Sequence, residues 1–224
     1  MSSATLAPPA QVPVRPPSPS EGPIVLYDAN WELYELTLDA IGDGWPHVNY
    51  LDGVMEFEMP GETHEMVKKV AARMVEAFLD ETETNYHALG SFTCRIRKKE
   101  AGLEPDECYY IQNAERAGQG GLDLASDPPP DLAVEVDRRR PAASRTLIYE
   151  RLRVPEVWLW QNDGRLQVML LAEKGGYVPA EQSVAIPGFP LERLSAELAR
   201  TPHAEQAQAL REFRTWCREQ AANG

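Results

Sequence analysis

The most informative stretch of the sequence is PPPDLAVEV, which spans residues 128–136. Three prolines form a stop signal, and the run from Leu132 to Val136 is apolar apart from one residue, which is typical of a strand buried on both faces. The exception is Glu135. Because burying an unpaired carboxylate costs several kcal/mol, this side chain needs a cation or hydrogen-bond donors beside it. The stretch therefore predicts a buried strand that carries a partnered glutamate.

The segments that follow this strand predict a helix and two further strands. Residues 142–153 have apolar positions at helical spacing. Residues 157–160 and 167–171 are strand-like and flank an Asn-Asp-Gly turn signal at 162–164. A strand, a helix and a strand in that order indicate a mixed α/β sheet with helices on its faces.

The segments that precede the strand predict a β-hairpin and a long helix. Residues 48–60 place Asp52-Gly53 between two strand-like runs, which is a hairpin signal. Apolar residues then recur at helical spacing over 66–79, with Thr63 as the expected N-cap. Further expectations are short strands at 92–96 and 108–111, a Gly-rich loop at 118–121, and a short helix or irregular segment at 31–36.

We expect one globular domain at 24–195 between two extensions. Residues 1–23 are rich in proline and poor in large apolar side chains, so they predict a disordered tail. Residues 196–224 predict a helical extension, with a helix over 202–220 whose apolar stripe includes Leu210, Phe213 and Cys217. This stripe is expected to pack on the core or on a second copy of the chain, which would make a homodimer.

Composition narrows the classes of function. The 224 residues carry 22 Lys and Arg against 35 Asp and Glu, a net charge of −13 that repels polyanions, so binding of DNA would depend on a local cationic groove. Three widely spaced cysteines indicate buried thiols rather than a disulfide framework or a CxxC zinc site. No apolar run is long enough to span a membrane and no secretory signal is present, so we expect a cytoplasmic protein.

Two carboxylates are candidates for a metal site. Asp106 lies at the start of a strand-like run, where it could converge with Glu135 on one hard cation such as Mg²⁺. The structural alternative is that Asp106 only caps a turn while Glu135 faces solvent from an edge strand.

A cationic stretch follows Glu135. Six arginines face one acidic residue, Glu150, over residues 138–153; they are Arg138, Arg139, Arg140, Arg145, Arg151 and Arg153. Arginines beside a metal site are suited to holding the phosphates of a phosphodiester. The alternative is an ordinary solvated helix face. His64 could act as an acid or base in the same cleft, or it could be a surface residue of a first helical turn.

Several enzyme classes lose support because their motifs are absent from the sequence. It contains no P-loop, GxGxxG fingerprint, GxSxG elbow or HExxH motif.

Four motifs in this order resemble one family. They are DGVMEF at 52–57 with His64-Glu65, EPDECYYIQN at 104–113, DPPPDLAVEVD at 127–137, and Ile148-Tyr149 followed by VPEVW at 154–158. Over residues 34–194 the chain is similar to the bacterial Uma-type restriction endonucleases of the PD-(D/E)XK superfamily.

The resemblance implies a restriction-endonuclease-like fold, in which a mixed β-sheet is flanked by helices after a β-hairpin. It implies that Asp106 and Glu135 bind Mg²⁺, or Mn²⁺ in its place, with the backbone carbonyl of Val136 as a further ligand. His64, Glu56 and Tyr149 are possible accessory residues. The cationic stretch makes Arg138, Arg139 and Arg140 candidate contacts to DNA.

The sequence differs from the superfamily pattern at the lysine position. The position two residues after Glu135 is Asp137, and the position that family members use, four residues before Tyr149, is Arg145. Arginine stabilises charge but stays protonated and cannot act as a base. The leading hypothesis is therefore a Mg²⁺-dependent endonuclease acting on DNA, with Asp106, Glu135 and Arg145 as its catalytic residues. The alternative is a catalytically impaired binding or interaction module with the same fold.

Overall fold

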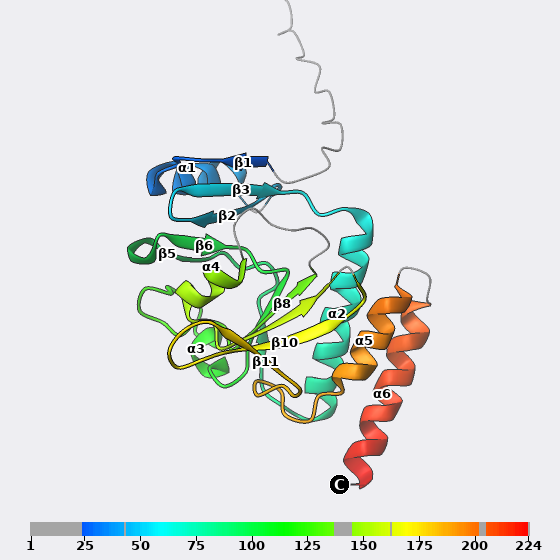
Figure 1. The fold of residues 1–224 in the computed structure, drawn as a ribbon. Coiled ribbons are helices and arrows are strands. Elements are labelled where there is room, and N and C mark those ends of the chain that lie inside the picture. The colour runs from blue at the N-terminus through cyan, green and yellow to red at the C-terminus, as the bar shows by residue number, and fades with distance from the viewer. Residues whose placement is uncertain (1–23, 43, 137–144, 162, 202–204, 224) are drawn as a thin grey trace, which may run out of the picture.

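The computed structural model describes residues 24–42, 44–136, 145–161, 163–201 and 205–223 of the chain (Figure 1). The predicted tail at 1–23 and the three arginines at 138–140 lie outside these residues. The mixed α/β class is confirmed, but the strands form two sheets where the sequence predicted one.

The smaller sheet is antiparallel and contains the predicted hairpin. Its strand order is β1-β3-β2-β6-β5. The hairpin consists of β2 (His47–Leu51) and β3 (Val54–Glu58), and Asp52 and Gly53 form its turn with φ of 45° and 86°. The other strands are β1 (Ile24–Leu26), β5 (Cys94–Ile96) and β6 (Ala101–Leu103), and a 3-10 turn, η1 (Arg97–Lys99), joins the last two.

The larger sheet is mixed and has the order β11-β10-β9-β8-β7-β4. At its centre β8 (Leu132–Val136) runs parallel to β9 (Glu156–Trp160), and this pair makes the sheet mixed, as the strand–helix–strand pattern predicted. The antiparallel strands are β7 (Glu107–Tyr110), β4 (His87–Ala88), β10 (Leu166–Leu171) and β11 (Tyr177–Ala180). All five residues of β8 are buried, so the predicted burial of this strand is confirmed.

Two helices begin close to the junction of the sheets. The long helix α2 (Glu62–Glu81) confirms the predicted one, but its N-cap is Gly61, so the assignment of Thr63 as the cap is wrong. The chain turns into the helix directly after β3, which places Thr63 inside the first turn. The helix α4 (Arg145–Leu152) begins at Arg145 and precedes the parallel strand β9.

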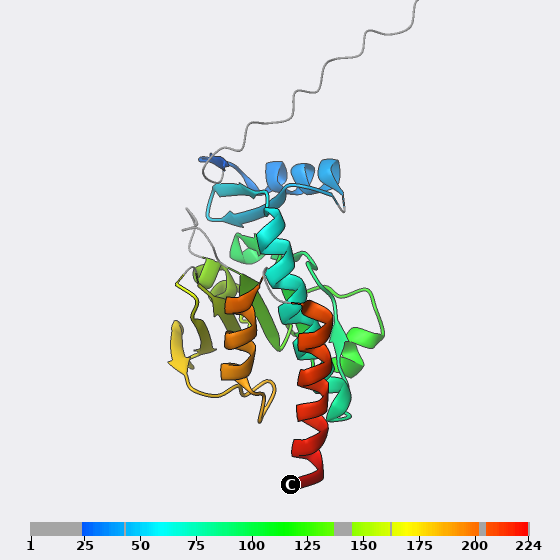
Figure 2. The same cartoon turned by 90° about the vertical axis from the view of Figure 1, so that its right-hand side faces the viewer.

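The remaining helices cover the outer faces. Helix α1 (Trp31–Ile41) lies on the smaller sheet. Its N-cap is Asn30, whose side chain accepts the Leu33 N–H at 2.9 Å. A short α3 (Ala114–Gly118) precedes the Gly-rich loop. Along α2 lie α5 (Leu191–Arg200), which the sequence did not predict, and α6 (Gln206–Asn223), as Figure 2 shows. The predicted boundary at residue 195 falls within α5.

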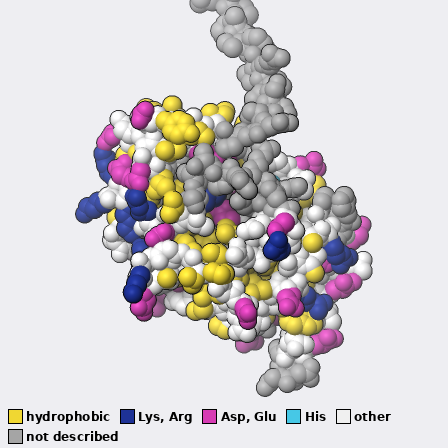
Figure 3. All heavy atoms as spheres, viewed as in Figure 1, with side chains coloured by type: hydrophobic (Ala, Val, Ile, Leu, Met, Phe, Trp, Pro, Cys, Tyr) yellow, Lys and Arg dark blue, Asp and Glu magenta, His cyan; other side chains and the backbone are white. Residues whose placement is uncertain are grey.

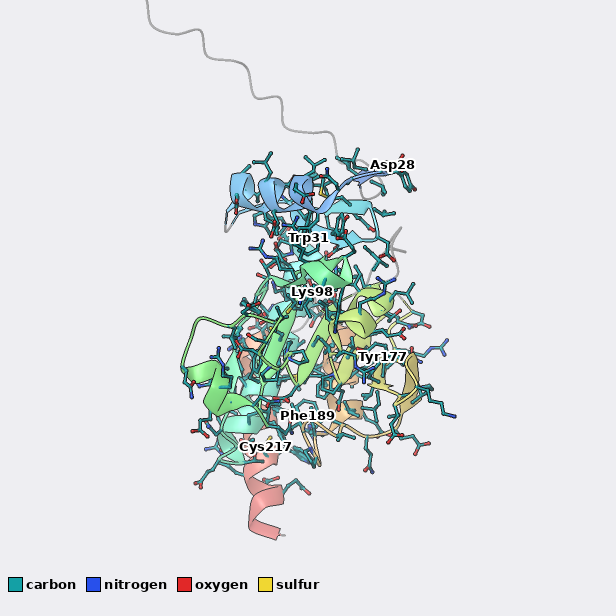
Figure 4. All side chains as sticks on the ribbon, turned by 90° about the vertical axis from the view of Figure 1, so that its left-hand side faces the viewer. Asp28, Trp31, Lys98, Tyr177, Phe189 and Cys217 are labelled. Carbon is teal, nitrogen blue, oxygen red and sulfur yellow. The ribbon has the colours of Figure 1, made fainter. Side chains whose placement is uncertain are left out.

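The core has three clusters that follow this layering. One lies between α1 and the hairpin and contains Trp31, and another holds α4 against both sheets. The largest lies between α2, the larger sheet, α5 and α6, and contains Phe189 and Cys217. Figure 4 shows Trp31 at one end of the molecule and Cys217 near the other.

The terminal helix packs within its own chain. Phe213 and Cys217 of its apolar stripe are buried, and Arg214 binds Asp80 and Glu81 at the end of α2, both at 3.1 Å. The expected packing on the core is confirmed, whereas the homodimer stays a prediction. All three cysteines are free and buried, as expected. None of the helices in the described ranges is long and apolar enough to cross a bilayer.

Candidate active site

The two predicted carboxylates lie on neighbouring strands of the larger sheet. Asp106 directly precedes β7, and Glu135 is the fourth residue of β8, one step beyond the Glu107–Val134 register pair. Both residues are buried, with exposed fractions of 4% and 2%. Because β8 lies between β7 and β9, the alternative of a solvent-facing glutamate on an edge strand is wrong.

Hydrogen bonds hold Asp106 from two sides. The backbone N–H of Val136 donates to its Oδ2 at 2.7 Å, and His64 Nε2 lies 2.9 Å from its Oδ1. His64 is in the first turn of α2, which the hairpin delivers to this end of the sheet. His64 is partly buried and contacts Asp106, and Asp106 accepts from a neighbouring strand, so it does more than cap a turn.

Arg145 is the centre of the second half of the site. Its Nη2 donates to Glu135 Oε1 at 2.9 Å and to the carbonyl of Glu104 at 2.8 Å, and its Nη1 forms an ion pair with Glu58. The Tyr149 hydroxyl, one turn further along α4, also donates to Glu135 Oε1. Arg145 thus joins three segments: the hairpin through Glu58, the segment before β7 through Glu104, and β8 through Glu135.

The charges of the site are strongly coupled. Burial and the neighbouring Asp106 raise the pKa of Glu135 to about 8, against the opposing effect of Arg145. Burial alone would raise the pKa of Asp106, but His64, Arg145 and the Val136 N–H together hold it below its usual value. Burial disfavours the charge on Arg145, yet Glu135 and Glu58 more than offset this and hold its pKa well above the usual value. Arg145 therefore remains a cation.

A second group of titratable residues surrounds this centre. Burial raises the pKa of Glu104 to about 7, and burial raises the pKa of Glu107 as well. His47 Nε2 lies 3.7 Å from Glu104 Oε2, and burial together with the nearby Lys68 lowers the pKa of His47. Lys68 lies one turn after His64 on α2 and is itself only 8% exposed.

The donor set suits a hard cation. Within the described residues no group of three or more His, Cys, Asp or Glu side chains is arranged to hold a metal ion. However, Mg²⁺ in proteins commonly takes one or two carboxylates and keeps water or substrate phosphate as its other ligands. Asp106 accepts the N–H of Val136, the residue after Glu135, so the two buried carboxylates meet at neighbouring strands, where a cation between them would stabilise their charge. Asp106 and Glu135 therefore fit Mg²⁺.

The other predicted residues are placed as follows. Tyr149 and Arg145 both contact Glu135, and Glu56 is fully buried on β3, two residues before Glu58. The Val136 backbone lies at the site through its N–H. The predicted DNA contacts Arg138, Arg139 and Arg140 lie outside the described residues. On the face shown in Figure 3, described Lys and Arg side chains gather mainly beside β5 and β6.

Sequence reasoning missed four residues of the site: Glu58, Glu104, Lys68 and His47. A signal existed for two of them. Glu56 and Glu58 alternate on one strand of the hairpin and therefore share a face, and Glu104 belongs to the acidic segment EPDE at 104–107. Nothing local marks His47 or Lys68, because their proximity depends on how the hairpin and α2 pack.

The chain is similar to a known protein family and to a solved structure. A family model, Uma2, described as "Putative restriction endonuclease", matches residues 31–201. A crystal structure described as "a putative nuclease belonging to DUF820 from Anabaena variabilis ATCC 29413" has a TM-score of 0.44 and 16% sequence identity, covering 75% of this chain and 92% of that chain. No curated protein matches the chain.

Proposed function

The chain belongs to the Uma2 family, whose model covers most of its length, and on that premise we propose that it is a Mg²⁺-dependent endonuclease that hydrolyses phosphodiester bonds of DNA. The observation that carries this proposal is the convergence of Asp106 and Glu135, both buried, beside the cation of Arg145. Two carboxylates and a fixed guanidinium are a suitable set for phosphoryl chemistry.

Asp106 and Glu135 would hold the metal, with the Val136 carbonyl as a further ligand. The metal, Mg²⁺ or Mn²⁺, would supply Lewis acidity and lower the pKa of a water molecule. Asp106 Oδ2, which accepts the Val136 N–H, retains a second lone pair for the metal. Arg145 and Tyr149 both donate to Glu135 Oε1, so Glu135 would bind the metal through Oε2.

Arg145 would stabilise charge that develops on the phosphate. Its guanidinium is fixed by Glu58, Glu135 and the Glu104 carbonyl, so little reorganisation is needed during the reaction. Since it stays protonated, it cannot accept the proton of the attacking water. His64, hydrogen-bonded to Asp106, would be a candidate to exchange that proton.

Cleavage of supercoiled plasmid tests the proposal. We expect wild-type protein to nick the plasmid with Mg²⁺ or Mn²⁺ and not with EDTA, and Asp106→Ala to be inactive with its fold intact. Asp39→Ala, which removes an exposed carboxylate of α1, is the matched control and should cleave as the wild type does. Activity that survives both Asp106→Ala and Glu135→Ala would refute the two-carboxylate site.

A second candidate is a binding or interaction module whose site no longer turns over. The observation that favours it is Arg145, which occupies the position where family members carry lysine and is committed to three partners. A ligand that binds only the folded state raises the melting temperature. Melting temperatures measured with and without millimolar Mg²⁺ or Mn²⁺ therefore show whether the protein binds metal. A folded protein that is inert as wild type and as Arg145→Lys would favour the module.

A further inference from the structure

A half-exposed tryptophan lies next to the site. Trp45 precedes β2, and 51% of its surface is exposed. Single exposed apolar residues are common on proteins and need no explanation by themselves. What distinguishes Trp45 is its packing, because its ring is stacked on the imidazole of His47, with 5.2 Å between the ring centroids and 28° between the planes. Trp45 thus combines a stacking contact with His47 and a surface that is half exposed.

Direct contacts link this stacked pair to the carboxylates. His47 is 8% exposed, and its Nε2 lies 3.7 Å from Glu104 Oε2. The carbonyl of Glu104 accepts a hydrogen bond from Arg145, which binds Glu135. His47 also pairs with Glu58 across the hairpin, and Glu58 is the other partner of Arg145. Trp45 is therefore the outermost member of a network that ends at the proposed metal ligands.

We propose that Trp45, backed by His47, is a stacking platform for an unpaired nucleobase, so that the substrate is single-stranded, frayed or extruded at the scissile position. This inference rests on the proposed nuclease function. Every nucleobase presents a π-face, and stacking on an aromatic side chain contributes about 1–3 kcal/mol per base. A base within an intact duplex already has both faces stacked and cannot use the platform.

The charges around the platform favour an uncharged flat ligand. The side chains next to His47 in the network are the acidic Glu104 and Glu58, so the platform offers no cation there to an acidic peptide or a free phosphate. His47 is held in its neutral form near pH 7, since burial and the nearby Lys68 lower its pKa. The pair is thus a neutral aromatic surface, while the cation that suits a phosphate is Arg145, further into the network.

Binding measured without cleavage tests this assignment. Fluorescence anisotropy with a short labelled oligothymidylate, and with a blunt duplex of equal length, is measured in EDTA for the full-length protein. We expect Trp45→Leu to weaken binding of the single strand about ten-fold, which corresponds to ~1.4 kcal/mol, and Trp45→Phe to retain most of the affinity. Tyr27→Leu removes another exposed aromatic side chain and should leave the affinity unchanged. The single strand should also quench tryptophan fluorescence in wild type more than in Trp45→Leu.

The outcomes separate this inference from the nuclease function. Equal affinity of wild type and Trp45→Leu for the single strand, no binding by wild type, or an equal loss for single strand and duplex would overturn the platform. Plasmid cleavage with unchanged binding by Trp45→Leu would keep the nuclease and reject the platform. Trp45-dependent binding without any metal-dependent cleavage would support the platform and reject the nuclease. Melting curves of each variant establish that the fold is retained.

Discussion

Two glutamates on adjacent parallel strands of the larger sheet are both buried, yet their surroundings differ. Glu156 on β9 accepts four hydrogen bonds from neutral donors: the Trp158 indole and Ser183 hydroxyl at 2.6 Å, and the Val184 and Ala185 N–H groups at 2.8 Å. Glu135 on β8 instead faces Arg145, the Tyr149 hydroxyl and a second carboxylate. One carboxylate fastens a loop to the sheet, and the other belongs to a charged site.

The partners of a buried carboxylate indicate whether it has a structural or a catalytic role. Four neutral donors compensate the lost hydration of the Glu156 carboxylate, and no charged side chain is among these four partners. Burial and Asp106 raise the pKa of Glu135 while Arg145 lowers it, and a buried group perturbed in this way is typical of functional sites. The difference between the two glutamates can be tested in four ways.

The first prediction concerns activity. We expect Glu135→Ala to lower metal-dependent plasmid cleavage by about 10³-fold, or ~4 kcal/mol in transition-state stabilisation, because it removes a proposed metal ligand. Initial rates under equal metal concentration measure this effect. Glu156→Gln should retain activity in proportion to its folded fraction. Similar losses in both variants would erase the distinction between the two glutamates.

The second prediction concerns stability. Glu156→Ala should lower the free energy of unfolding by about 3 kcal/mol, because it leaves the Trp158, Ser183, Val184 and Ala185 donors without their acceptor. Urea denaturation measures this change, with Glu181→Ala, an exposed carboxylate, as the control. If Glu156→Ala were as stable as the control, the loop would not depend on this side chain.

The third prediction concerns pH. Since the pKa of Glu135 is raised to about 8 in the folded state, the folded protein retains a proton that the unfolded chain releases near pH 4.5. Stability without metal should therefore fall as pH rises from about 5 to 8, with a slope of up to about 1.4 kcal/mol per pH unit from this group. Glu104, with its pKa raised to about 7, adds a slope of the same sign. Glu135→Gln should flatten the dependence.

The fourth prediction concerns the hydroxyl beside Glu135. Tyr149→Phe should lower the free energy of unfolding by about 1 kcal/mol, because a buried hydrogen bond to the carboxylate is lost. Removal of this bond should also raise the pKa of Glu135 further, so the pH slope should extend to higher pH. Tyr110→Phe, which loses a bond to the Pro128 carbonyl instead, should leave the slope unchanged.

Local patterns were sufficient for the elements with strong signals. The Asp52-Gly53 turn, the period of α2 and the apolar run of β8 all describe interactions within a few residues, and each element was predicted correctly. Glu135 was found because one charge interrupts an apolar strand. Glu156 was missed because Pro155-Glu156 reads as the end of a loop, although the strand begins there.

Long-range packing was beyond these patterns. The division into two sheets depends on β6 pairing with β2, and β6 consists of only Ala101, Gly102 and Leu103. Gly102 is required there, since a Cβ would lie 2.3 Å from the Tyr34 hydroxyl oxygen. The ion pair of Arg145 with Glu58 joins residues 87 positions apart, and no local spacing encodes it.

The helix α4 is attached to the hairpin at both ends. Arg145 at its start holds Glu58 at the end of β3, and Arg151 near its end binds Asp52 in the hairpin turn at 2.6 and 2.9 Å. Two separated contacts oppose rotation of the hairpin relative to α4 about either one of them. We therefore expect the two sheets to move as a single body. A substrate would then be accommodated by movements of side chains and connecting loops and not by a hinge motion between the sheets.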